Sequence, residues 1–144
     1  MQILEEHPLS KHYLKRLIDI RLEKIRDYSF QDMSAIEKYA EYSNSSIYYL
    51  LLQAHGVNNI NADHAASHMG KAHGIINLVR SVPYNASKRI NMLPQDILMK
   101  HNVSAEAVLQ GESSKNFHDV IYDVASQGKL HLDAVSIYQT SLMD

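Results

Sequence analysis

Hydrophobic positions recur at helical spacing along almost the whole chain, and no segment alternates as a half-buried strand would. The spacing predicts helices over residues 9–27, 31–55, 62–80, 94–101, 104–111 and 114–142. Glycine and proline are scarce, with 5 and 3 residues respectively, which also favours helices over a turn-rich β fold. The sequence therefore predicts an all-α fold.

The ends of these helices follow from residues with known terminal preferences. Gly56 is expected to end the second helix in the left-handed conformation. Pro83 is expected to stop the third helix at Arg80, so that residues 81–93 form a polar loop, and Pro94 fits the first position of the next helix. Three other residues are predicted N-caps: Ser10, Asn61 and Ser104.

Each long helix has an apolar face that we expect to be buried. The third helix is rich in alanine on this face, with Gly70 and Gly74 beside it, so that another helix or a ligand can approach its backbone closely. The apolar run Ile47–Leu52 is more typical of core than of a ligand-binding wall. Other expected core positions include Leu14, Leu17, Ile18, Ile25, Phe117, Val120, Ile121, Val124, Leu132, Val135 and Tyr138.

Composition narrows the classes of function. The chain has 144 residues, enough for one domain, and a formal net charge of −2, which argues against a dedicated nucleic-acid binder. It has no cysteine, which excludes disulfides, thiol catalysis and cysteine-ligated metals. Residues 1–9 contain Glu5 and Glu6 and no apolar core, so they resemble neither a secretory signal nor a good mitochondrial transit peptide.

Two groups of side chains have metal-ligand spacing, but a structural interpretation is favoured for both. His64 and His68 are four residues apart on one helix face, although no third ligand is evident. Asp19, Glu23 and Asp27 are also spaced by four and could hold a divalent cation. Lysines and arginines surround these acids, which is typical of a solvated face with ion pairs between successive turns.

The stretch from Ala62 to Pro94 resembles the second signature of the squalene/phytoene synthase family. The residues in register with that signature are Gly70, Ala72, Asn77, Arg80, Leu93 and Pro94. The segment Glu37–Leu52 is similar to the helix that precedes it in the family. The resemblance implies an isoprenoid-synthase-like helical bundle, in which residues 1–144 form a single partial domain, incomplete at both ends.

The resemblance also implies the loss of catalysis. Family enzymes join two prenyl diphosphates with the help of Mg²⁺, which two aspartate-rich motifs hold. Ser81 and Asn85 stand where the second motif has aspartates, and Pro83 between them is expected to disturb their alignment. A hydroxyl and an amide supply no anionic charge to attract Mg²⁺. Tyr48 stands where the family has glycine and should narrow the prenyl tunnel. We therefore expect a pseudoenzyme with no catalytic residue, no metal and no cofactor.

Several segments resemble one branch of the family, whose members take part in the assembly of mitochondrial respiratory complex I. They are residues 62–75, 78–84, 93–97 and 119–132. The resemblance implies a non-catalytic scaffold whose partners are complex I subunits or other assembly factors. It also implies a place on the matrix side of the inner membrane, with peripheral membrane contact and no nucleic acid; a cytosolic isoform is the alternative.

Two other functions remain open. The chain could bind an isoprenoid or phospholipid without turnover, with Arg80, Lys88 and Arg89 pairing with a phosphate or lipid head group. The structural interpretation of these residues is that Arg80 makes an internal contact and the other two are loop charges. An active head-to-head prenyltransferase would need other carboxylates, such as those of residues 19, 23 and 27.

Overall fold

The structure is a computed structural model that describes residues 9–143, so the expectation about a leader at residues 1–8 lies outside it. Its elements, in chain order, are α2 (Lys11–Arg26), α3 (Met33–Ala40), the π-helix η1 (Glu41–Ser45), α4 (Ser46–Ala54), α5 (Ile60–Ser87), α6 (Gln95–Lys100), α7 (Ala105–Leu109) and α8 (Lys115–Met143). Within the described residues the only β pairing is an isolated bridge between Phe30 and Pro94. The predicted all-α fold is confirmed.

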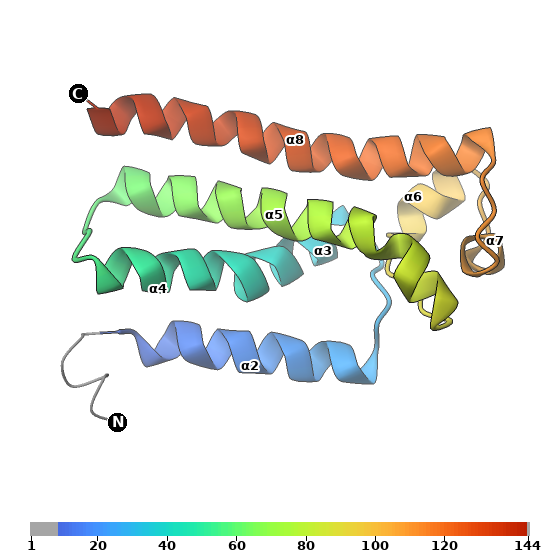
Figure 1. Ribbon diagram of the computed structural model, residues 1–144, viewed down its shortest axis with the longest axis horizontal. Helices are drawn as coiled ribbons and strands as arrows, with labels where there is room; N and C mark the ends of the chain where they lie inside the picture. Colours follow the sequence, from blue (N-terminus) through green and yellow to red (C-terminus); the bar gives the residue numbers. More distant parts are fainter. Residues whose placement is uncertain (1–8, 144) are drawn as a thin grey trace.

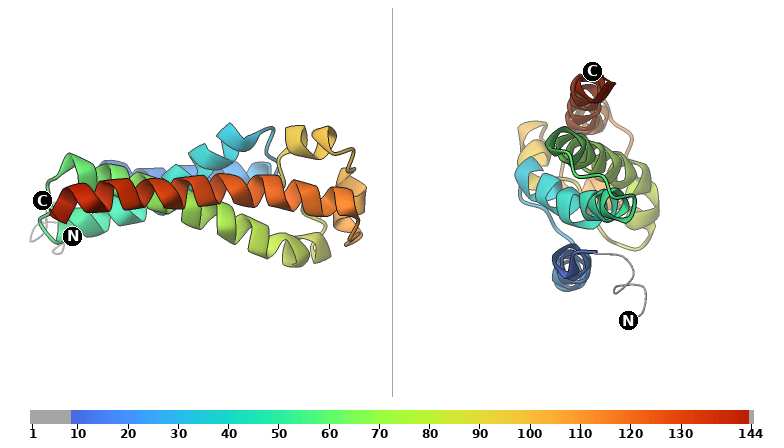
Figure 2. Two further views of the ribbon diagram at one scale, coloured as in Figure 1. Left: turned by 90° about the horizontal axis from the view of Figure 1, so that it is seen from above. Right: turned by 90° about the vertical axis from the view of Figure 1, so that its left-hand side faces the viewer.

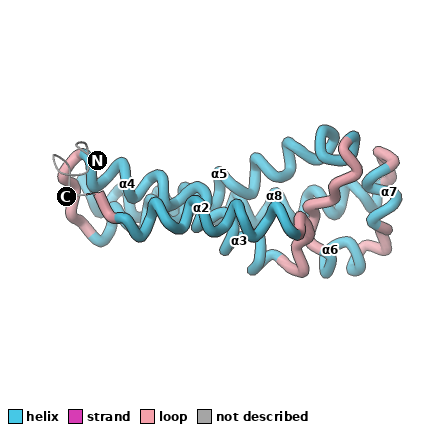
Figure 3. The backbone as a smooth tube through the Cα atoms, turned by 90° about the horizontal axis from the view of Figure 1, so that it is seen from below, coloured by secondary structure: helices cyan, strands magenta, loops and turns pink. Residues whose placement is uncertain are grey.

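The long helices lie side by side in an elongated bundle (Figure 1). The end-on view of Figure 2 places α2 and α8 on opposite sides of the pair formed by α4 and α5. The short helices α6 and α7 lie at the end of the bundle where α8 begins, and the tube in Figure 3 shows several connecting loops gathered there. None of the helices in residues 9–143 is both long and apolar enough to cross a membrane.

The hydrophobic core lies toward the α6–α7 end. Its buried members come from the α2–α3 and α5–α6 connections and from α3, α5, α6, α7 and α8: Phe30, Ile36, Ile75, Leu78, Val82, Leu93, Leu98, Val108, Val120 and Val124. The other end of the bundle has fewer large buried side chains, because alanines and serines fill the crossing of α5 with η1. The fold therefore has one well-packed end and one more open end.

Helix α5 runs through Pro83 to Ser87, so the predicted stop at Arg80 and the predicted loop over residues 81–87 are wrong. Proline removes one backbone hydrogen bond, but it does not prevent helix formation where packing stabilises the segment. Val82 and Ala86 are buried, 9% and 7% exposed, on the same face as Leu78. Burial of this face therefore outweighs the cost of the proline.

The predicted caps are partly right. Ser104 accepts a hydrogen bond from the Ala107 N–H, and Gly56 has φ +69° just after α4, as expected. The N-cap of α5 is Asn59 and not Asn61, since the Asn59 side chain accepts from the backbone N–H groups of residues 61 and 62. Pro94 is the N-cap of α6 and not its first residue, and Ser10 occupies its cap position without a side-chain hydrogen bond.

Several residues expected in the core are exposed. On α2, Ile18 and Ile25 are 60% and 65% exposed, whereas Ile20 is only 3% exposed. The helix therefore turns a different side toward η1 and α4 from the one that its pattern indicates. Leu132 on α8 is also half exposed. Among the described residues nothing covers these apolar faces.

The small residues of α5 do allow a close approach, as predicted. A Cβ atom built on Gly70 would lie 2.1 Å from the Ser45 Oγ, and one on Gly74 would lie 2.5 Å from the Ala40 Cβ. The Ser45 hydroxyl donates to the Ser67 carbonyl at 3.0 Å across this crossing. The π-helix η1 therefore packs almost directly against the backbone of α5.

Candidate functional site

A cavity of about 440 Å³, with charged and polar side chains in its lining, lies beside the C-terminal half of α5. Side chains from α2, α3, η1 and α5 line it. We call it the arginine pocket, after five of its lining residues: Arg21, Asn77, Arg80, Ser81 and Asn85. The fold thus brings Arg80 and the two positions that we expect to replace the motif aspartates into one cavity.

Ser81 and Asn85 contact each other within a continuous helix. The Ser81 hydroxyl donates to the Leu78 carbonyl at 2.8 Å and accepts from the Asn85 side-chain amide at 3.0 Å. The same amide lies 3.3 Å from the Met92 Sδ. The expectation that Pro83 would disturb the alignment of the two positions is therefore wrong, because helix α5 continues through the proline.

The charge in the arginine pocket is positive. Arg21 reaches it from α2 and donates to the Leu17 carbonyl at 2.8 Å. Arg80 is exposed and forms no hydrogen bond or ion pair with the side chains that the structure describes, those of residues 9–140. No aspartate or glutamate is among the described residues that line the cavity. The pocket therefore attracts anions and repels cations.

The other two predicted head-group residues do not line this pocket. The Lys88 Nζ lies 5.9 Å from the centre of the Tyr84 ring. Arg89, with φ +60°, forms two hydrogen bonds of 3.2 Å with the Glu106 carboxylate, and this pairing lowers the pKa of Glu106. Arg21, which the sequence reasoning missed, is the second arginine of the pocket.

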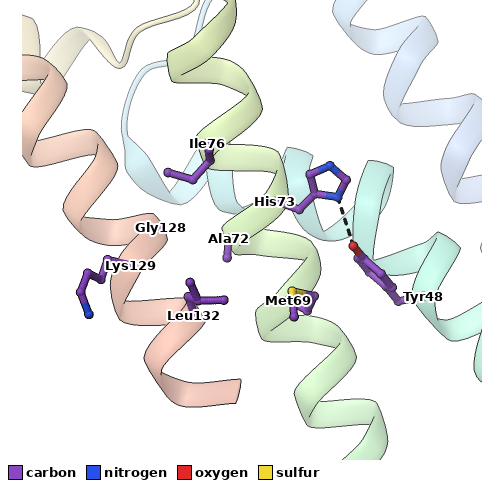
Figure 4. Close-up of a pocket in the computed structure, with 8 residues that line it drawn as sticks. All are labelled: Tyr48, Met69, Ala72, His73, Ile76, Gly128, Lys129 and Leu132. Atoms are coloured by element: carbon purple, nitrogen blue, oxygen red, sulfur yellow. Dashed lines mark hydrogen bonds between the residues drawn. The ribbon is translucent and has the colours of Figure 1, made fainter. Parts of the chain in front are cut away.

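An apolar groove lies between α4, α5 and α8. It consists of two cavities of about 410 and 540 Å³ that share Tyr48 and Met69. Figure 4 shows the first cavity, where the Tyr48 hydroxyl lies 3.2 Å from the His73 Nδ1. Within the run Ile47–Leu52, the first residue and Leu51 are 42% and 50% exposed, and three residues of the run line the groove. The expectation that the run is simply core is therefore wrong.

The groove and the arginine pocket share one face of α5. Met69, His73, Ile76 and Arg80 follow one another at intervals of three or four residues, so their side chains lie in a row along the helix. The row begins at the apolar groove and ends at Arg80, which lines the arginine pocket. This face could therefore accommodate a ligand with an apolar part and an anionic end.

The two groups with metal-ligand spacing have other contacts. Among residues 9–143, no three histidine, aspartate or glutamate side chains converge as a metal site. The rings of His64 and His68 pack against Tyr138 of α8, with centroids 5.3 and 5.8 Å apart. Asp19 forms an ion pair with a lysine one turn away, and Asp27 accepts hydrogen bonds from Ser29 that lower its pKa.

Residues 1–144 match the squalene/phytoene synthase family. The chain belongs to this family, which confirms the resemblance seen in the sequence. The fold is similar to that of the squalene synthase HpnC from Alicyclobacillus acidocaldarius, with a TM-score of 0.87 over 95% of this chain and 52% of that one. Sequence identity to that structure is 12%, so the likeness shows the fold alone.

Among proteins, the chain is 42% identical over 139 residues to NADH dehydrogenase (ubiquinone) complex I, assembly factor 6, of Mus musculus. It is 44% identical over 129 residues to the Homo sapiens protein of that name. These matches cover 96% and 90% of this chain, but 42% and 39% of the two relatives. The chain thus spans about two fifths of the length of these relatives.

Proposed function

We propose that this protein is a non-catalytic factor in the assembly of mitochondrial respiratory complex I. Two relatives above 40% identity have names that describe that role. The observation that supports the loss of catalysis is the arginine pocket, where Ser81 and Asn85, the positions at which the resemblance implies aspartates in the family, lie beside two arginines.

The residues of the pocket do not fit Mg²⁺. Hard divalent cations bind carboxylate oxygens, and none of the described residues that line the pocket has a carboxylate. At positions 81 and 85 the pocket offers a hydroxyl and an amide that are already hydrogen-bonded to each other. The guanidinium groups of Arg21 and Arg80 would repel a cation, and little nearby negative charge opposes them. Without bound Mg²⁺, the pocket lacks the cation with which family enzymes activate the diphosphate leaving group, so we infer a pseudoenzyme.

In this role the protein would present helical surfaces to unassembled complex I subunits or to other assembly factors. Apolar side chains on α2 are available for such contacts, since Ile18, Leu22 and Ile25 are each more than half exposed. The same surfaces would allow peripheral contact with the inner membrane from the matrix side. A scaffold of this kind needs exposed apolar faces, which the bundle has.

The test is complex I content in cells depleted of the protein. We expect the assembled complex I band on a native gel to fall after depletion and to return on re-expression of the full-length protein. The purified protein should form no labelled product from farnesyl diphosphate and Mg²⁺. An unchanged complex I band would contradict the assembly role, whereas Mg²⁺-dependent product would contradict the loss of catalysis alone.

A second function is favoured by the position of Arg80, which lies one turn beyond Ile76 of the groove in the same row of α5 side chains. An isoprenoid or phospholipid could place its chain along Met69 and Ile76 and its phosphate between Arg21 and Arg80. Binding without turnover is compatible with an assembly role. The structure favours Arg80 over Lys88 and Arg89 as the contact, since only Arg80 lines the cavity.

We expect Arg21→Gln and Arg80→Gln to weaken the binding of farnesyl diphosphate, measured by titration calorimetry without Mg²⁺. Each change removes a charged hydrogen-bond donor worth about 1.5–3 kcal/mol, so each should cost at least about tenfold in affinity. Lys88→Gln is the matched control, because this lysine is nearby but does not line the pocket. Equal effects of all three changes would show general charge attraction instead of a site.

A further inference from the structure

Two histidines and a glutamate connect three helices in the open half of the bundle. The Nδ1 atoms of His68 on α5 and His131 on α8 lie 2.9 Å apart. The Nε2 of His131 lies 3.1 Å from the Oε1 of Glu37 on α3. The His131 side chain is 14% exposed and that of Glu37 is 33% exposed. We call these three residues the histidine cluster.

The contact between the two rings restricts how many protons the pair can hold. At 2.9 Å, one Nδ1 must donate a hydrogen and the other must accept it. With both histidines neutral, the His68 Nδ1–H donates to His131, whose Nε2–H donates to Glu37. One further proton is compatible with the contact, because a charged His131 can donate at both nitrogens. A second proton would place two N–H groups face to face and two positive charges in contact.

The surroundings of the cluster contain both signs of charge. Facing His68 are Glu41 from η1, Lys71 and His64 on α5, and Tyr138 on α8. Burial is the main cause of a lowered pKa for His68, and the charges of His131, Lys71 and His64 act in the same direction. Glu41 opposes these effects, and Glu37 lies on the far side of His131.

We propose that the histidine cluster is an acid-sensitive latch that holds α8 against α5 and α3 while at least one of the two histidines is neutral. Protonation of both rings breaks the Nδ1–Nδ1 contact and lets this part of α8 move away. The latch borders the apolar groove, because Met69 and Leu132, which line the groove, are the chain neighbours of His68 and His131. Its release therefore widens the groove.

The direction of the pH dependence follows from proton uptake. In the unfolded chain a histidine binds its proton near pH 6.5, whereas folded His68 binds it only at lower pH. The stabilisation from neutral His68 is therefore fully present above about pH 6.5 and is lost as the pH falls through the folded pKa. Between about pH 6.5 and the lowered pKa, the open state binds a proton that the closed state does not. For each such proton, the ratio of closed to open protein falls by up to about tenfold per pH unit as the pH decreases.

The test is the distance between α5 and α8 as a function of pH. The chain has no cysteine, so spin labels can be placed at Ile60→Cys and Gln139→Cys, two exposed positions near the same end of the bundle. We expect one narrow distance distribution at pH 7.5 and a second, longer population that grows as the pH falls from 6.5 to 5. A distribution that stays unchanged down to pH 5 would overturn the proposal.

Variants show whether the histidines cause the change. In His68→Gln, the amide still donates to His131 but cannot be protonated, so we expect the closed distribution at every pH. We expect the same result for His131→Gln, which replaces the first variant in the test if that variant does not fold. His12→Gln, at an exposed position on α2, is the matched control and should keep the parent's transition. Acid opening that persists in both cluster variants would show that other groups cause it.

Discussion

Replacing Gly70 by alanine is expected to lower the free energy of unfolding by about 3 kcal/mol, near the upper end of overpacking effects. The added Cβ would lie 2.4 and 2.5 Å from the backbone N and Cα of Ser45, and these atoms cannot rotate away. The crossing of η1 and α5 would have to open. This opening would weaken the hydrogen bond from Ser45 to the Ser67 carbonyl. Urea unfolding followed by circular dichroism measures the change.

Gly128→Ala provides the matched control for Gly70→Ala. Gly128 is also a helical glycine in a helix–helix contact, but the three atoms nearest to its Cβ would be side-chain atoms of Ile75 and Ile76, at 3.2–3.4 Å. These atoms can shift, and alanine favours the helix by up to about 1 kcal/mol, so the net change should be less than about 1 kcal/mol. Similar decreases in the free energy of unfolding of the two variants would contradict the close approach of η1 to α5 at Gly70.

The helices themselves were predictable, because apolar periodicity and caps are local signals. The continuation of α5 beyond Arg80 was not, since it depends on the burial of Val82 and Ala86 by distant parts of the chain. The π-helix η1 was also missed. It is an irregularity inside an apparently uniform helical pattern, and small residues such as Ser43 and Ser45 gave it no distinctive periodicity.

The candidate site was predictable only where one helix contains it. Arg80, Ser81 and Asn85 belong to one motif, so the sequence could group them. Arg21 looked like part of a solvated charged face, and only the packing of α2 beside η1 brings it to the pocket. Sequence spacing also grouped His64 with His68, whereas the structure pairs His68 with a histidine 63 residues away.

Phe30→Ala is expected to cost about 4 kcal/mol in the free energy of unfolding, as for large aromatic side chains removed from a core. Phe30 is 1% exposed, and its ring lies 5.5 Å from the Tyr39 ring and 4.0 Å from the Lys24 Nζ. It anchors the connection between α2 and α3 to α6, where the Gln95 N–H donates to the Phe30 carbonyl at 3.0 Å. Thermal and urea unfolding measure the loss.

The alanine variant retains that backbone hydrogen bond, so the loss reports the side chain alone. Tyr28→Ala, two residues earlier in the same connection and 43% exposed, is the control and should cost less than about 1 kcal/mol. Backbone hydrogen exchange in α2 should also be faster in the Phe30 variant, because the connection that contains Phe30 links α2 to the well-packed end of the bundle. An equally small loss of unfolding free energy in both variants would show that Phe30 does not anchor the connection. Another contact would then have to hold α2, and with it Arg21, at the arginine pocket.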